Sequence, residues 1–137
     1  MRGSPRSATR IGLALFCLLT AACAPTAVGA PGGIGYTGRG ATALVQAEVP
    51  QVFQSTAAVF EEMGIQLTDR RGRSGRGGSA LGNNITVNGR RGATEVLVSI
   101  ERETNASSEV SVRVREGRAD YNRELAGEIL SRIVAKR

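Results

Sequence analysis

The second half of the chain alternates between apolar and polar residues. In the segments 94–102 and 109–115, every second residue is valine or isoleucine: Val96, Val98, Ile100, Val110, Val112 and Val114. Successive side chains of a strand point to opposite faces, so this period of two predicts two strands that bury the same face. Shorter alternating segments predict three more strands, at 41–47, 65–69 and 83–88.

Two other segments repeat their apolar residues every three or four positions, which is the period of a helix with one buried face. The first runs from Val49 to Met63, with Pro50 near its start and Gly64 just after its end. Proline is favoured in the first helical turn, and glycine after the last one. The second begins near Asp120, which we expect to cap it, and its apolar residues are Tyr121, Leu125, Ile129, Leu130, Ile133 and Val134.

These elements occur in the order strand, helix, four strands, helix. That order predicts an α+β fold, a two-layer sandwich in which two helices pack on one face of a mainly antiparallel sheet of about five strands. We expect Phe53 and Phe60 in the core, and Arg113 and Arg115 facing water. The dipeptide Asn88-Gly89 is typical of tight hairpin turns and predicts one after the strand at 83–88.

The start of the chain follows a different pattern. Three arginines precede an apolar run of 12 residues, Ile11–Ala22, which ends at Cys23. A basic start, a short apolar run and small residues at a cleavage site are features of a secretory signal. The run is too short to span a bilayer, which takes roughly 20 apolar residues. The small residues before the cysteine resemble a bacterial lipoprotein signal. We therefore expect removal of 1–22 and lipid attachment at Cys23.

An ordinary secretory signal, cleaved after Ala22 or after Ala30, is the alternative. Bacterial lipoproteins usually carry leucine three residues before the cysteine, where this chain has Thr20. The other cysteine, Cys17, lies inside the apolar run, so the processed chain would form no internal disulfide. In lipoproteins of this kind, Ala24 after the cysteine implies sorting to the outer membrane, where the protein would face the periplasm.

Composition then divides the rest of the chain. Residues 23–40 are rich in glycine, proline and alanine, and predict a flexible tether. Residues 41–137 predict one small domain, with an Arg/Gly-rich loop at 70–82. Removing 1–22 takes away three arginines and no acid, so 18 basic side chains become 15 against 12 acidic ones, a net charge of +3.

Three segments are similar to those of a known family. They are Glu-Glu-Met-Gly-Ile-Gln-Leu at 61–67, Val-Ser-Val-Arg-Val-Arg-Glu-Gly at 110–117 and Ile-Leu-Ser-Arg-Ile at 129–133. With the lipidated start and the Gly-Tyr tether, they resemble a family of small bacterial lipoproteins catalogued only as a domain of unknown function, number 3568. The resemblance covers 11–137 and implies an envelope lipoprotein with no established activity, and it supplies no catalytic residue.

One cluster of side chains suggests a ligand. Six arginines fall within 22 residues, against the single acid Asp69: Arg70, Arg71, Arg73, Arg76, Arg90 and Arg91. Arginine binds phosphate and carboxylate groups through paired hydrogen bonds, so the cluster predicts a site for lipid headgroups, lipopolysaccharide or another polyanion. A solvated loop without a ligand is the alternative, since 17 of the 18 basic residues are arginine anyway.

Other chemistry has little support in the sequence. The chain has no histidine, and its one retained cysteine is assigned to the lipid, so we expect no metal site, no cofactor and no catalytic residues. Gly33-Ile-Gly-Tyr-Thr-Gly38 matches a dinucleotide-binding motif, but it precedes a strand instead of linking a strand to a helix. Export and few aromatic residues argue against nucleic acid. The expected function is a non-catalytic envelope module that binds another envelope protein or a polyanion.

Overall fold

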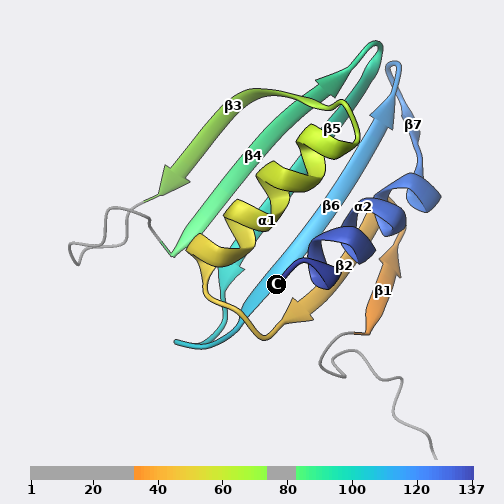
Figure 1. Cartoon of the computed structure of the whole chain (residues 1–137). Coiled ribbons are helices and arrows are strands. Elements are labelled where there is room, and N and C mark those ends of the chain that lie inside the picture. Colours follow the sequence, from red (N-terminus) through yellow and green to blue (C-terminus); the bar gives the residue numbers. More distant parts are fainter. Residues whose placement is uncertain (1–32, 74–82) are drawn as a thin grey trace, which may run out of the picture.

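The computed structural model of the chain describes residues 33–73 and 83–137 (Figure 1). The predictions for the signal peptide 1–22, for Cys23, for residues 23–32 of the tether and for Arg76 fall outside these ranges. None of the helices within the ranges is both long and apolar enough to cross a membrane.

The described chain forms one antiparallel sheet and two helices. The strand order is β1-β2-β6-β5-β4-β3, and the short β7 pairs with the end of β6. In chain order the elements are β1 (Ile34–Thr37), β2 (Gly40–Val45), α1 (Val49–Glu62), β3 (Gln66–Arg73), β4 (Asn84–Arg91), β5 (Thr94–Arg102), β6 (Ser108–Glu116), β7 (Asp120–Tyr121) and α2 (Arg123–Ala135). Both helices lie on the same face of the sheet, as Figure 1 shows. The α+β two-layer sandwich is therefore confirmed.

The core lies between the helices and the sheet. All six valine and isoleucine side chains predicted to face inward from β5 and β6 are buried. Burying each stabilises the fold by roughly 1.5–3 kcal/mol relative to an exposed side chain. Ala41, Ala43 and Val45 of β2 are also buried, and α2 packs over this strand and β6. α1 packs over β3, β4 and β5.

The first helix begins and ends as its sequence predicts. Before its first residue, the side-chain Oε1 of Gln51 accepts a hydrogen bond from the backbone N–H of Glu48 at 3.3 Å. After its last turn, Gly64 takes a φ of 65°. Ile65 folds back, donating its N–H to the carbonyl of Phe60 at 2.7 Å, and its side chain is buried. Phe60 is buried as expected, whereas Phe53 is only partly buried.

The start of α2 differs from the prediction. Asn122 caps the helix, its Oδ1 accepting from the N–H of Leu125 at 2.9 Å. Asp120, the predicted cap, pairs instead with Glu116, and Tyr121 pairs with Arg115 as strand β7. The N–H of Asn122 donates to the carbonyl of Val114 at 2.9 Å, which keeps this segment extended along β6. Tyr121 is 39% exposed and is not part of the core.

The hairpin turn predicted at Asn88-Gly89 is also wrong. Both residues lie inside β4, opposite Leu97 and Val96 of β5, and the turn lies at Gly92, whose φ is 60°. Packing explains the glycine at position 89. A Cβ there would lie 2.5 Å from side-chain carbons of both Phe60 and Ile65. Gly89 leaves room for these two side chains and does not serve a reversal of the chain.

Two boundaries also shift. Residues 34–40, predicted as tether, form β1, the turn and the first residue of β2, and Tyr36 of β1 pairs with Ala41 of β2. The ring of Tyr36 packs over Gly127 of α2, where a Cβ would lie 2.4 Å from the tyrosine hydroxyl. The composition of this segment predicts a flexible tether, but the contact with α2 helps to hold it as a strand. Residues 70–73 of the predicted loop 70–82 belong to β3, and residues 74–82 lie outside the described part of the chain. With β1 and β7 included, the sheet has seven strands rather than about five.

Candidate binding groove on the helix-free face

Both described helices lie on one face of the sheet, so the described residues place no helix on its second face (Figure 1). Antiparallel sheets commonly bury one face and leave the other to water. We call this second face of β2 to β6 the open face. Its outward side chains are Thr42, Leu44, Gln66, Asp69, Arg71, Asn84, Thr86, Asn88, Arg90, Glu95, Leu97, Ser99, Glu101, Glu109, Ser111, Arg113 and Arg115.

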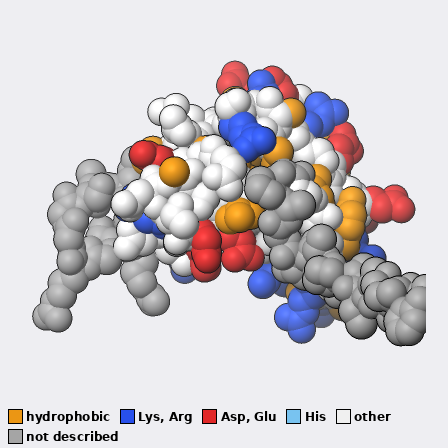
Figure 2. Space-filling view, turned by 90° about the horizontal axis from the view of Figure 1, so that it is seen from below, with side chains coloured by type: hydrophobic (Ala, Val, Ile, Leu, Met, Phe, Trp, Pro, Cys, Tyr) orange, Lys and Arg blue, Asp and Glu red, His pale blue; other side chains and the backbone are white. Residues whose placement is uncertain are grey.

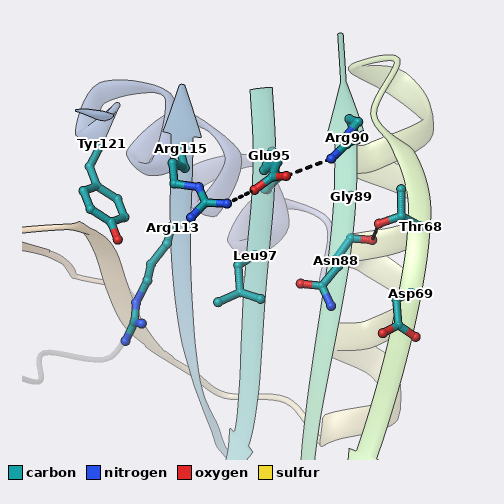
Figure 3. A pocket seen from close by; sticks show the side chains of 11 residues that line it. Thr68, Asp69, Asn88, Gly89, Arg90, Glu95, Leu97, Arg113, Arg115 and Tyr121 are labelled. Carbon is teal, nitrogen blue, oxygen red and sulfur yellow. Dashed lines mark hydrogen bonds and ion pairs between the residues drawn. The ribbon is translucent and has the colours of Figure 1, made fainter. Parts of the chain in front are cut away.

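The strand register arranges these side chains in rows that cross the sheet. One row contains three charged residues side by side and runs Tyr121, Arg115, Glu95, Arg90, Gln66. The next row is mixed in character and runs Gly40, Arg113, Leu97, Asn88, Asp69. The residues of one row come from different strands, and Figure 3 shows Arg115, Glu95 and Arg90 of the first row side by side.

Glu95 lies between two arginines. Its carboxylate accepts hydrogen bonds from Arg90 Nη2 at 2.8 Å and from Arg115 Nη2. These bonds, Arg90 first and Arg115 second, lower the pKa of Glu95 from its ordinary value. All three side chains remain about half exposed, so the ion pairs contribute little to stability. They hold both guanidinium groups along one edge of the face.

The Glu95 network predicts a small dependence of stability on pH. A carboxyl whose pKa is lower in the folded state stabilises the fold above its unfolded pKa, and this contribution is lost as pH falls through the folded pKa. Glu95→Gln should therefore unfold slightly more easily than the wild type at neutral pH, and the difference should vanish in acid. Urea denaturation at a series of pH values measures it. A difference that grows on acidification would contradict the sign of the shift.

Arg113 is in a different electrostatic position. Across 33–73 and 83–137 its side chain has no ion pair and no hydrogen bond. Two acids of the neighbouring rows have other partners: Glu95 is paired with Arg90 and Arg115, and Glu109 accepts a hydrogen bond from the Thr42 hydroxyl at 3.1 Å. Arg113 is exposed, and the residue opposite it on β5 is the apolar Leu97. Its positive charge is therefore not neutralised by these acids.

A groove of about 560 Å³ lies over these two rows. It is lined by Thr68, Asp69, Asn88, Gly89, Arg90, Glu95, Val96, Leu97, Arg113, Arg115 and Tyr121. In Figure 3, Leu97 lies in the middle, Arg113 and Tyr121 lie on one side, and Asn88 and Asp69 lie on the other. This volume is within the usual range for small-molecule sites, roughly 300–1,000 Å³.

Tyr121 is held at the rim of the groove. The guanidinium carbon of Arg39, in the turn between β1 and β2, lies 5.8 Å from the centre of its ring. A cation over an aromatic ring is attracted to the electrons of the ring face. Asp69, on the opposite side, accepts a hydrogen bond from Arg71 Nε at 2.7 Å. The two ends of the groove therefore differ: one has the free guanidinium and a phenol, and the other has a neutralised carboxylate and an amide.

The arginines singled out in the sequence do not all converge. Arg70 and Arg91 lie on the helix side of the sheet. The Arg70 guanidinium lies 4.3 Å from the centre of the Phe53 ring, and Arg91 Nη1 donates to the carbonyl of Met63 at 3.2 Å. Arg91 thus stabilises the C-terminal end of α1, where cations are favourable.

Two others lie on the open face but apart from each other. Arg71 is opposite Thr86 and Arg90 is opposite Gln66, so four residues of β4 separate them, or about 13 Å. Arg73 lies in β3, but its side chain is outside the described part of the structure, as is Arg76. All four arginines with described side chains already contact a group within the fold.

The groove residues were not identified as a site in the sequence. The alternating pattern places Arg113 and Arg115 toward water, which is correct, but only the register shows that Arg113, Leu97 and Asn88 share a row. The helical period of the C-terminal segment predicts Tyr121 in the core, whereas the structure leaves it exposed at the groove rim. The sequence does contain one indication of this site, namely a leucine and two arginines at outward positions of two neighbouring strands: Leu97, Arg113 and Arg115.

The described side chains supply few groups for chemistry. Within the two ranges, no three residues among histidine, cysteine, aspartate and glutamate lie close enough to hold a metal ion.

Figure 2, which views one end of the molecule, shows acidic and basic side chains interspersed with scattered hydrophobic atoms. Such a surface suits polar recognition better than a broad apolar contact.

No protein-family model matches this chain, and no curated protein is significantly similar to it. The resemblance to the lipoprotein family of unknown function therefore stays a prediction from the sequence, neither confirmed nor refuted.

Proposed function

We propose that this protein is a non-catalytic binding module anchored to a membrane of the bacterial cell envelope by a lipid on Cys23. The residue after it, Ala24, favours the outer membrane. Its binding surface is the open face of the sheet. In this proposal the helices stabilise the domain, and the groove contacts a component of the envelope.

The observation that carries the binding role is the contrast between the two faces. One face is buried under α1 and α2, whereas the other has a groove with an unneutralised arginine at one side. A guanidinium group recognises carboxylate and phosphate by charge and by directed hydrogen bonds. The groove therefore offers a specific contact, and the described residues offer no constellation for catalysis.

The anchor is supported by the order of segments in the chain. The basic start, the apolar run Ile11–Ala22 and Cys23 precede β1 by only ten residues, counting from Ala24 to Gly33. A connector this short would keep the domain close to the membrane surface, since an extended chain reaches at most about 3.5 Å per residue. The ligand would then be another component within reach of that surface.

Polyanion binding through the six sequence-predicted arginines has less support. Two of the four with described side chains lie on the helix side, and each of the four already contacts another group of the fold. A polyanion would need them on one surface. We therefore assign ligand binding to the groove and a structural role to Arg70 and Arg91.

Lipid attachment can be tested with the two cysteines of the chain. In bacterial cells grown with an alkyne palmitate analogue, the wild type should be labelled and should sediment with membranes. Cys23→Ser should remove the label, whereas the matched variant Cys17→Ser should keep it, because Cys17 leaves with the signal peptide. An unlabelled wild type recovered in the cytosol would refute the anchor, and equal labelling of Cys23→Ser would place the lipid elsewhere.

A further inference from the structure

We propose that the groove binds a short peptide or peptide-like chain by its free carboxylate, and that Arg113 is the residue that takes the carboxylate. This inference rests on the proposed binding role of the open face and names the class of its ligand. It follows from three features of the groove: one unneutralised cation, an apolar middle and an amide.

Arg113 is the cation available to a ligand. The other two arginines of the groove, Arg90 and Arg115, already share the carboxylate of Glu95. Arg113 has no such partner in the ranges that the structure describes, and Gly40, its neighbour on β2, has no side chain to cover it. A carboxylate bound there would form charge-assisted hydrogen bonds, which are among the stronger polar contacts in proteins. The Tyr121 hydroxyl lies on the same side of the groove and is a second donor (Figure 3).

The remaining lining fits the body of a peptide. Leu97, in the middle, offers an apolar surface, and the side-chain amide of Asn88 can both donate to and accept from a peptide bond. Arg113 and Asn88 are two strands apart, which corresponds to about 10 Å. About three residues of an extended chain cover that distance.

The charges of the groove favour a single carboxylate over a polyanion. Asp69 and Glu95 also line it, but Asp69 is paired with Arg71, and Glu95 is paired with Arg90 and Arg115. Among the described residues that line the groove, Arg113 is then the one arginine without an ionic partner, so a ligand with several phosphates would find one cation for one of its charges. A ligand with one negative group, an apolar side chain and a peptide bond matches the groove better.

Tyrosine fluorescence can report this binding, because the chain has no tryptophan and only two tyrosines. In a Tyr36→Phe background, Tyr121 at the groove rim is the only tyrosine, and the phenylalanine keeps the ring that packs over Gly127. Full-length protein in detergent would be titrated with N-acetyl-Leu-Gly, with the same dipeptide capped as an amide, and with inorganic phosphate. We expect a saturable change with the free carboxylate, at least tenfold weaker binding of the amide, and no saturation with phosphate.

Two arginine variants complete the test. Arg113→Gln should weaken binding of N-acetyl-Leu-Gly at least tenfold. Arg102→Gln is the matched control. It also removes one exposed positive charge, but at the end of β5 that lies away from the groove, so this variant should bind N-acetyl-Leu-Gly as the parent does. Both should retain the thermal unfolding midpoint of the parent within a few degrees, since neither arginine has a described side-chain partner.

Three results would overturn the inference. The first is equal binding of the acid and the amide, or unchanged binding in Arg113→Gln. The second is saturable phosphate binding stronger than that of the peptide. The third is a dimer, found by sedimentation and lost in Glu109→Gln, because a second copy would then supply the carboxylate. None of these results bears on lipid attachment, which the Cys23 labelling decides separately.

Discussion

Replacing Val112 with aspartate is expected to abolish the folded state. Val112 is fully buried in the centre of β6, between Ala41 of β2 and Val98 of β5. The substitution removes a buried apolar side chain and places a carboxyl group where no described residue can pair with it. Burial of an unpaired charge combined with the lost packing costs on the order of 5 kcal/mol, comparable to the whole stability of a small domain.

Circular dichroism and thermal denaturation measure this effect. The matched control is Ser111→Asp, which introduces the same carboxylate one residue away on the open face, where Ser111 is only partly buried. The control should keep the wild-type spectrum and lose no more than about 1 kcal/mol, as surface substitutions usually do. A folded Val112→Asp protein with an ordinary unfolding transition would show that the helix-covered face is not the core.

Replacing Gly40 with alanine is expected to cause the second largest loss. A Cβ at this position would lie 2.0 Å from the carbonyl oxygen of Val112 and 3.2 Å from the Cα of Arg113. Both are main-chain atoms, so no side-chain rotation can relieve the clash and β2 has to move away from β6. We expect a loss of about 3 kcal/mol, the upper part of the range for overpacked interiors.

Gly38 provides the control for that variant. It lies two residues earlier, in the turn between β1 and β2, and a Cβ there would meet nothing within 4 Å. Gly38→Ala should therefore unfold at nearly the wild-type urea concentration, whereas Gly40→Ala should unfold at a clearly lower one. Equal midpoints for the two variants would contradict the close approach of β2 and β6.

Most of the architecture could be predicted because the apolar residues follow the period of each element. The alternation at Val96, Val98 and Ile100 leaves only one face to bury, and the stripe from Val49 to Phe60 leaves only one side of a helix. The period of the apolar residues indicates which side chains become buried on folding, and the burial of apolar surface is the main driving force of folding.

The errors arose where one residue type serves two physical purposes. Glycine at position 89 has the chemistry of a turn, but its role is to accommodate Phe60 and Ile65. Tyr121 fits the helical period of α2, yet the hydrogen bond from Asn122 to Val114 keeps it extended beside β6. The sequence contains neither contact, because each joins segments that only the tertiary fold brings together.

The candidate site was harder to predict for the same reason. Six arginines close in sequence suggested a site, but those with described side chains lie on two faces. Arg113, Leu97 and Asn88 are distributed over 26 residues of the chain, from 88 to 113, and share a row only because of the sheet register. Shifting one strand by a single residue would turn its outward side chains into the core. Candidate ligand contacts therefore depend on register more than on local composition.

The central claim is that the helix-free face of the sheet is the binding surface, and nuclear magnetic resonance tests it most directly. Spectra of isotope-labelled full-length protein would be recorded during addition of N-acetyl-Leu-Gly. We predict that the Leu97 methyl groups, the Asn88 side-chain amide and the Tyr121 ring signals shift together, while the methyl groups of Leu130, buried under α2, do not. Shifts confined to α1 and α2, with the Leu97 and Asn88 signals unmoved, would contradict the account.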